Sequence, residues 1–165
     1  MRPRCSLQAT GIFILIIALG TADARAAAPG DACALLSPAQ LSAALVLPMD
    51  AGKYVTPGYV RTCTWTPSGG ATPAIKFVTL FLLSADDYRA SKSVMQAAQS
   101  KGGNAVTSVN GVGDDAYFSS IGSSVTSLMV KKGAVAFKLS LYGATAPDKA
   151  MAIEKTLASQ ALANL

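Results

Sequence analysis

The sequence predicts an α+β fold: a single layer of mostly antiparallel sheet covered by helices, with one disulfide. Residues 135–142 alternate between apolar and polar side chains, which is typical of an antiparallel strand with one solvated face. Helix-start patterns occur at Ser37 and Ser84, and an alanine- and leucine-rich stripe closes the chain. Strand-like segments lie in adjacent pairs with helices set between them, an order that favours the α+β class.

The N-terminus has the pattern of an export signal. Arg2 and Arg4 precede a short apolar run at 11–20, and small residues then give A-x-A cleavage patterns that end at Ala24 and Ala26. A membrane-spanning helix needs about 20 apolar residues, and this run is shorter. We therefore expect cleavage near Ala24–Ala26, with a retained N-terminal anchor as the alternative.

Cleavage divides the chain into a signal peptide, residues 1–26, and a single α+β envelope domain, residues 27–165. A domain of this length can bury one core. We expect the mature protein to be exported, either periplasmic or extracellular. No second apolar run in the mature part is long enough to span a membrane, so we expect no transmembrane segment there.

The charge pattern does not favour nucleic-acid binding. The full chain carries a formal net charge of +5, and removal of the charged leader residues (Arg2, Arg4, Asp23 and Arg25) lowers it to +3. Lys131–Lys132 is the only adjacent basic pair of the mature part. A nucleic-acid interface needs a basic stripe, so we expect no nucleic-acid partner.

Cys33 leaves three alternatives: a lipid anchor, a ligand or nucleophile, or half of a disulfide. A lipid anchor needs its cysteine directly after the apolar core of the signal, and Cys33 lies well beyond that core. Zinc usually takes four Cys or His ligands, and the chain has no histidine. Because Cys5 leaves with the signal, Cys33 and Cys63 remain as an even pair in an exported chain, which predicts a disulfide. Closing a loop of about 30 residues stabilises a fold by roughly 3–4 kcal/mol in the chain-entropy model.

The first helix is predicted from Ser37 to about Leu45. Ser37 is the N-cap, Pro38 occupies the first helical position, and Gln40 completes a capping box. Pro48 should end the helix because proline cannot continue it.

Two strands should follow. Residues 48–60 are rich in glycine and proline and predict a loop. The next segment alternates and places Arg61, Cys63 and Trp65 on one face, with Trp65 packed in the core. Residues 74–84 are apolar on both faces, so we expect a central strand there.

A second helix is predicted from Ser84, its N-cap, with Asp87 at the third helical position. Asp86 and Asp87 suit the positive end of the helix dipole. Gly102–Gly103 should end this helix. Four residues should mark one face: Tyr88, Ser91, Met95 and Ala98.

The remaining chain predicts strands, then a last helix. Strands at 105–109 and 116–119 flank a turn at 110–115, and residues 124–142 form a hairpin that turns at Lys132–Gly133. The last helix should begin near Pro147. Its apolar stripe needs a sheet to cover it: Ile153, Leu157, Ala161 and Leu165.

Three segments and the closing helix together resemble a family of small exported bacterial proteins of unknown function, many of them lipoprotein-like. The segments are CALLSPAQLSAAL at Cys33–Leu45, CTW at Cys63–Trp65 and VNGVGDDAYF at Val109–Phe118. The resemblance implies a compact α+β envelope domain with its two cysteines paired. This chain lacks the lipobox cysteine of many relatives, which favours a soluble exported form. The family supplies no catalytic residue to carry over.

The composition excludes the commonest catalytic arrangements. With no histidine, Ser-His-Asp and Cys-His sites are impossible, and the S-x-x-K spacing does not occur. We therefore expect no catalytic residue. The serines near Gly122 predict a polar loop between strands: Ser119, Ser120, Ser123 and Ser124.

Other motifs favour ordinary structural roles. Residues 111–116 match G-x-G-x-x-A, but a strand rather than a helix should follow, so we expect no nucleotide cofactor. Asp114 and Asp115 could join Asp31, Asp86 or Asp87 around calcium, yet no EF-hand pattern is present, so we expect no metal. Tyr88 and Lys92 form Y-x-x-x-K, which without a dinucleotide fingerprint indicates an ordinary helical pair.

These observations predict a non-catalytic exported domain without a cofactor. It should bind a partner in the cell envelope, whether a protein, a glycan or a lipid. The alternative is a carrier of lipid or a small apolar ligand, suggested by the apolar strand at 74–84 and the leucine- and alanine-rich helices. A hydrolase that uses Ser, Lys and Asp groups is the less favoured third hypothesis.

Overall fold

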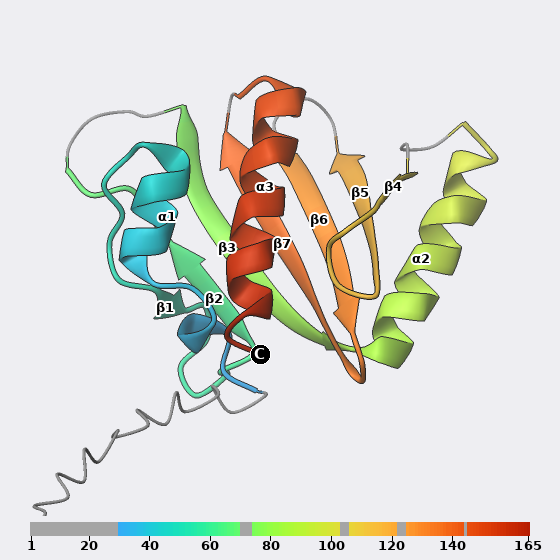
Figure 1. Cartoon of the computed structure of the whole chain (residues 1–165), viewed down its shortest axis with the longest axis horizontal. Helices are drawn as coiled ribbons and strands as arrows, with labels where there is room; N and C mark the ends of the chain where they lie inside the picture. The colour runs from blue at the N-terminus through green and yellow to red at the C-terminus, as the bar shows by residue number, and fades with distance from the viewer. Residues whose placement is uncertain (1–29, 70–73, 103–105, 122–124, 144) are drawn as a thin grey trace, which may run out of the picture.

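The computed structural model describes residues 30–69, 74–102, 106–121, 125–143 and 145–165. Within these ranges the chain forms three α-helices, one short 3-10 helix and a seven-stranded antiparallel sheet, which confirms the predicted α+β class (Figure 1). The predicted signal peptide and Cys5 lie outside the described residues. No helix in the described part is both long and apolar enough to cross a membrane.

The elements follow the predicted order, with β1 as an addition. They are η1 (Ala32–Ala34), α1 (Pro38–Leu45), β1 (Lys53–Tyr54), β2 (Thr62–Trp65), β3 (Ile75–Ser84), α2 (Ala85–Gln99), β4 (Val106–Val109), β5 (Asp115–Ile121), β6 (Val125–Lys132), β7 (Val135–Gly143) and α3 (Pro147–Leu162).

The sheet order is β1-β2-β3-β7-β6-β5-β4, and every neighbouring pair is antiparallel. Strand β3 lies between β2 and β7, so the prediction that 74–84 is a central strand is confirmed. Strand β7 joins the two halves of the chain, because it pairs with β3 on one side and with β6 on the other.

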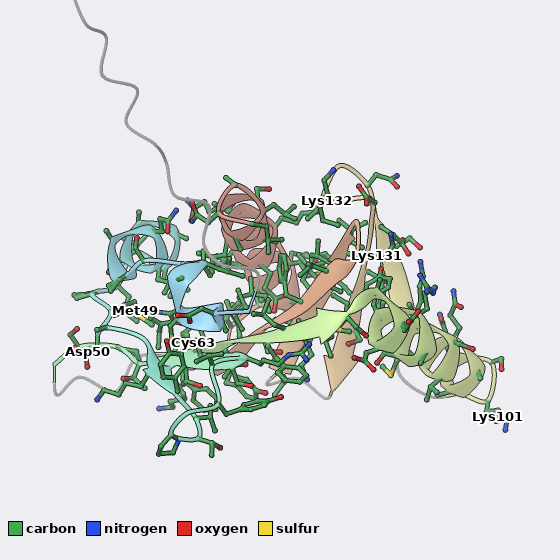
Figure 2. The ribbon with its side chains drawn as sticks, turned by 90° about the horizontal axis from the view of Figure 1, so that it is seen from below. Met49, Asp50, Cys63, Lys101, Lys131 and Lys132 are labelled. Atoms are coloured by element: carbon green, nitrogen blue, oxygen red, sulfur yellow. A yellow bond between two sulfur atoms is a disulfide. The ribbon has the colours of Figure 1, made fainter. Side chains whose placement is uncertain are left out.

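The three helices cover the sheet unequally. Helices α1 and α3 pack on one face over the main core, which contains Leu41, Trp65, Phe137 and Leu157. Helix α2 packs on the opposite face, and Figure 2 shows it away from α1 and α3. That second face was expected to be solvated, but side chains beneath and beside α2 are buried, as Tyr117 illustrates.

The predicted helix starts are confirmed in atomic detail. Ser37 Oγ accepts a hydrogen bond from Gln40 N–H, and the Gln40 side chain accepts one from Ser37 N–H. Ser84 and Asp87 make the same reciprocal pair at the start of α2. Helix α3 begins at Pro147, as predicted. These starts are local, because each depends on residues three positions apart.

The predicted end of α1 at Leu45 is confirmed, but the residue that ends it is Val46, which adopts a left-handed conformation, rather than Pro48. Helix α2 ends at Gln99, before Gly102. Its predicted face continues as far as Met95, since Tyr88 is buried and Ser91 and Met95 are half-buried, but Ala98 is exposed.

Three strand predictions also change. The predicted loop at 48–60 contains the short strand β1, which pairs with β2. Ser119 and Ser120 belong to β5 rather than to a polar loop, and Ser123 and Ser124 lie outside the described residues. Strand β5 is also longer than the predicted 116–119.

Candidate functional site: a disulfide-braced loop beside Arg61

Cys33 and Cys63 form a disulfide with an S–S distance of 1.98 Å and a Cα–Cα distance of 5.0 Å. The bond joins η1 to β2, and Figure 2 shows Cys63 inside the fold. Cys63 and Trp65 are both buried in the main core, so the prediction that Trp65 packs in the core is confirmed. The predicted pairing is confirmed, and its role is to hold the N-terminal segment against the sheet.

The segment from the end of β1 to the start of β2, residues 54–61, is called here the 54–61 loop. Two hydrogen bonds attach it to the residues that precede Cys33. Ala32 N–H donates to Val60 O at 2.8 Å, and Tyr54 Oη donates to Asp31 Oδ2 at 2.9 Å. The bond to Asp31 raises the pKa of Tyr54, with smaller contributions from burial and from the Asp31 charge. The loop is therefore braced by a covalent bond and two hydrogen bonds.

The 54–61 loop exposes an unusual share of apolar surface. Of the six large apolar side chains that the described residues expose, four lie on this loop. They are Tyr54, Val55, Tyr59 and Val60, between 39% and 61% exposed. The other two, Val46 and Val94, lie on separate elements. Single exposed apolar residues are ordinary, but a cluster of them marks an interaction surface.

Two open hollows border this loop. One measures about 480 Å³ and extends from Val60 toward Val135 on the β6–β7 hairpin. The other measures about 470 Å³ and extends from Tyr59 across β3 to Ser91 on α2. Arg61, Leu82 and Leu83 line both, so the two hollows share this part of their wall.

The walls of the hollows are mainly apolar and carry two opposite charges. Arg61 is exposed, and Asp87 contributes a carboxylate from the first turn of α2. Hydrogen bonds from the Ser84 side chain and backbone lower the pKa of Asp87, and the Arg61 charge lowers it further. Because Asp87 is held in the capping box, its carboxylate faces its own helix N-terminus.

This arrangement suits binding better than catalysis. Ser84, which lines the first hollow, donates from its Oγ to Oδ2 of Asp87, which lines the second, at 2.7 Å, so a hydroxyl does lie beside a carboxylate. A carboxylate whose pKa is lowered is a weak proton acceptor, so Asp87 is a poor general base for Ser84. The remaining walls offer apolar contacts and one guanidinium, which are groups that bind and orient a partner.

The structure gives the aspartates considered for calcium separate partners. Asp31 accepts from Cys33 N–H and Tyr54, and Asp114 accepts from Gly133 N–H at 2.7 Å and from Lys132 at 3.0 Å. Lys92 forms an ion pair with Asp115, and Arg89 forms one with Asp86. Ser84 donates a hydrogen bond to Asp87. Among the described residues, no three candidate ligands come together.

The G-x-G-x-x-A segment is a turn that leads into β5, so a strand follows it as predicted. Gly111 and Gly113 have φ of +79° and +64°. A Cβ on Gly113 would lie 2.5 Å from Lys131 O, so only glycine fits this close approach.

Tyr88 and Lys92, the Y-x-x-x-K pair, both face the sheet. Lys92 Nζ donates to both carboxylate oxygens of Asp115, and the Tyr88 ring lies against that of Tyr117 with centroids 5.4 Å apart. Burial raises the pKa of both tyrosines, Tyr117 to about 12, so neither hydroxyl ionises readily. Sequence reasoning missed the partners because they lie on β5, distant along the chain.

Glu154 is a buried acid that sequence reasoning did not single out. It is 0% exposed between α3 and the sheet, and its Oε1 accepts from Leu141 N–H at 3.2 Å. The sequence did carry a signal of its burial, because Glu154 lies four residues from both Ala150 and Ala158, on the apolar stripe of α3.

No known protein family, curated protein or solved structure matches this chain. The resemblance to exported lipoprotein-like proteins therefore stays a prediction.

Proposed function

We propose that this protein is an exported, non-catalytic domain that binds a protein of the cell envelope through the 54–61 loop and the two hollows beside it. The observation that carries the proposal is the gathering of exposed apolar side chains on one braced loop. Tyrosine is enriched at protein interfaces because its ring offers a large apolar surface and its hydroxyl still pairs with polar groups.

The bracing supports a binding role on energetic grounds. Association costs about 0.5–1.5 kcal/mol for each flexible side chain that must be ordered, and mobile loops add to that cost. The disulfide and the Ala32–Val60 and Asp31–Tyr54 hydrogen bonds hold the loop before a partner arrives. A loop that is already ordered can therefore use more of its apolar contact energy for binding.

Export is part of the proposal. The N-terminal charge pattern and apolar run support a signal peptide, and the disulfide is compatible with an oxidising compartment. The mature form would then meet its partner in the periplasm or outside the cell.

The packing beneath α3 leads us to place the partner on the surface rather than in an interior cavity. One hollow near the start of α3, lined by Thr126, Leu141 and Ala150 among others, measures about 10 Å³. A space of about 10–15 Å³ holds one water molecule. A lipid would not fit this hollow, and the two hollows of about 470–480 Å³ are open to solvent, so we rank the carrier function second.

Site-specific photo-crosslinking in the native envelope tests the proposal. A photoreactive residue at Tyr59 should give a covalent adduct of one discrete mass, identified by mass spectrometry as a protein. The matched control places the same group at Val94, a more exposed apolar position on α2. No adduct at Tyr59, or the same adducts at both positions, would contradict the proposal, and a lipid adduct would favour the carrier.

A further inference from the structure

We infer that the partner presents an extended acidic segment, in which a carboxylate binds Arg61 and apolar side chains on either side enter the two hollows. This inference rests on the proposed function and specifies the chemistry of its partner. It follows from the position of one cation between two apolar hollows.

The backbone of Arg61 is anchored, and its charge is only partly balanced by the nearby Asp87. Its backbone carbonyl accepts Leu82 N–H at 2.8 Å, so the root of the side chain is held against β3. The guanidinium makes no ion pair with the described residues. A guanidinium can bind a carboxylate through two parallel hydrogen bonds, and an exposed guanidinium is accessible for such a pair.

The nearby carboxylate of Asp87 does not form an ion pair with Arg61. Asp87 lines the same hollow, but its Oδ2 already accepts from Ser84 Oγ at 2.7 Å and from Ser84 N–H at 3.3 Å. The capping box thus keeps Asp87 on α2 while Arg61 remains open to a partner.

A second cation lies on the same face of the sheet. Lys138 stands opposite Phe81 in the β3–β7 register, and Phe81 lines the second hollow. Lys138 is half-buried and, like Arg61, makes no ion pair with the described residues. Arg61 and Lys138 are therefore the two cations near this surface that could pair with an anionic partner.

The paired hollows favour a peptide over a free anion. In an extended chain, side chains at i, i+2 and i+4 point the same way and lie about 6–7 Å apart. An apolar residue, an acid and a second apolar residue at that spacing would meet one hollow, Arg61 and the other hollow. The predicted pattern is apolar-x-acidic-x-apolar.

Selection from a phage-displayed library of random heptapeptides on the purified exported protein tests this pattern. Wild type should enrich peptides with a central Asp or Glu and apolar residues two positions away on each side. Arg61→Gln should lose this enrichment, and the affinity for an enriched peptide should fall about 10- to 100-fold. Lys101→Gln removes the same charge at the far end of α2, visible in Figure 2, and should bind like wild type.

The outcomes separate this inference from the proposed function. Peptides without an acid, equal enrichment on Arg61→Gln, or no enrichment at all would overturn the acidic-segment inference. An adduct at Tyr59 alongside any of these results would leave the proposed function standing. Two further experiments measure binding to phosphatidylglycerol vesicles and, separately, to inorganic phosphate. Binding to either probe that depends on Arg61, without any peptide enrichment, would also reject the inference.

Discussion

Lys92 on α2 donates hydrogen bonds to both carboxylate oxygens of Asp115 on β5, each at 2.8 Å. Their side chains are 22% and 38% exposed, so the pair is partly shielded from water. It joins elements distant in sequence, and α2 buries little else beyond Tyr88. This ion pair is therefore a main attachment of α2 to the second face of the sheet.

The first prediction is that Lys92 and Asp115 are energetically coupled. A double-mutant cycle with Lys92→Met and Asp115→Asn should give a coupling free energy of about 1 kcal/mol, measured by urea unfolding. The control is Arg89–Asp86, an exposed ion pair on the same helix, for which coupling of at most about 0.5 kcal/mol is expected. Equal coupling in the two pairs would show that shielding contributes nothing.

The second prediction concerns the disulfide. The double variant Cys33→Ser/Cys63→Ser should lose about 3–4 kcal/mol of unfolding free energy, because the unfolded chain regains the freedom that the closed loop removes. Reductant should destabilise wild type by a similar amount and leave the double variant unchanged. A wild type equally stable with and without reductant would contradict this role.

The third prediction concerns Val46, which has φ of 53° and is 91% exposed. A β-branched residue is strained in the left-handed conformation, where glycine is usual after a helix. Val46→Gly should therefore stabilise the protein by about 1 kcal/mol. Val94→Gly, the same change at an exposed position inside α2, should destabilise it by about 0.5–1 kcal/mol. Chemical denaturation of both variants checks the opposite signs, and a shared sign would reject the strain argument.

The local features of the fold could be predicted because their signals lie close together in the sequence. The Ser37–Gln40 and Ser84–Asp87 capping boxes each span one helical turn. Alternation in β7 placed Phe137 and Leu139 on one face, and both are buried in the main core. The disulfide could be predicted by counting the cysteines that remain in a chain predicted to be exported.

The strand order could not be predicted in the same way. Alternation indicates which residues share a face, but it does not say that β7 pairs with both β3 and β6. Strand β1, at two residues, is too short for any periodic signal. These features depend on contacts between segments far apart in the chain.

Only part of the candidate site could be predicted from the sequence. Alternation assigned Arg61 to the face of Cys63 and Trp65, but Arg61 precedes the first residue of β2 and is exposed. The loop residues Tyr54 and Tyr59 gave no signal of exposure, because the same residues pack in cores elsewhere. Their grouping appears only once the disulfide and the hydrogen bonds place the loop.

Glu154 makes stability depend on pH. Burial raises the pKa of Glu154 to about 8, and the neighbouring Thr126 side chain and the hydrogen bond from Leu141 N–H offset this in part. The carboxyl is therefore mainly protonated in the folded protein at neutral pH.

The last prediction follows from the sign of this shift. The unfolded glutamate has a pKa of about 4.3, so between this value and about 8 the folded protein holds a proton that the unfolded chain releases. The stability from burying Glu154 is complete below about pH 4.3 and is lost as the pH rises through 8. Glu154→Gln keeps an oxygen for Leu141 N–H and cannot ionise, so it should match wild type at pH 4 and exceed it by roughly 3–5 kcal/mol at pH 8.5. With no histidine in the chain, few other groups titrate in this range, and urea unfolding followed by the fluorescence of Trp65 measures both proteins. If the free energy of unfolding changed with pH in the same way for both proteins, ionisation of Glu154 would not destabilise the fold. That result would contradict the claim that a buried acid makes stability depend on pH.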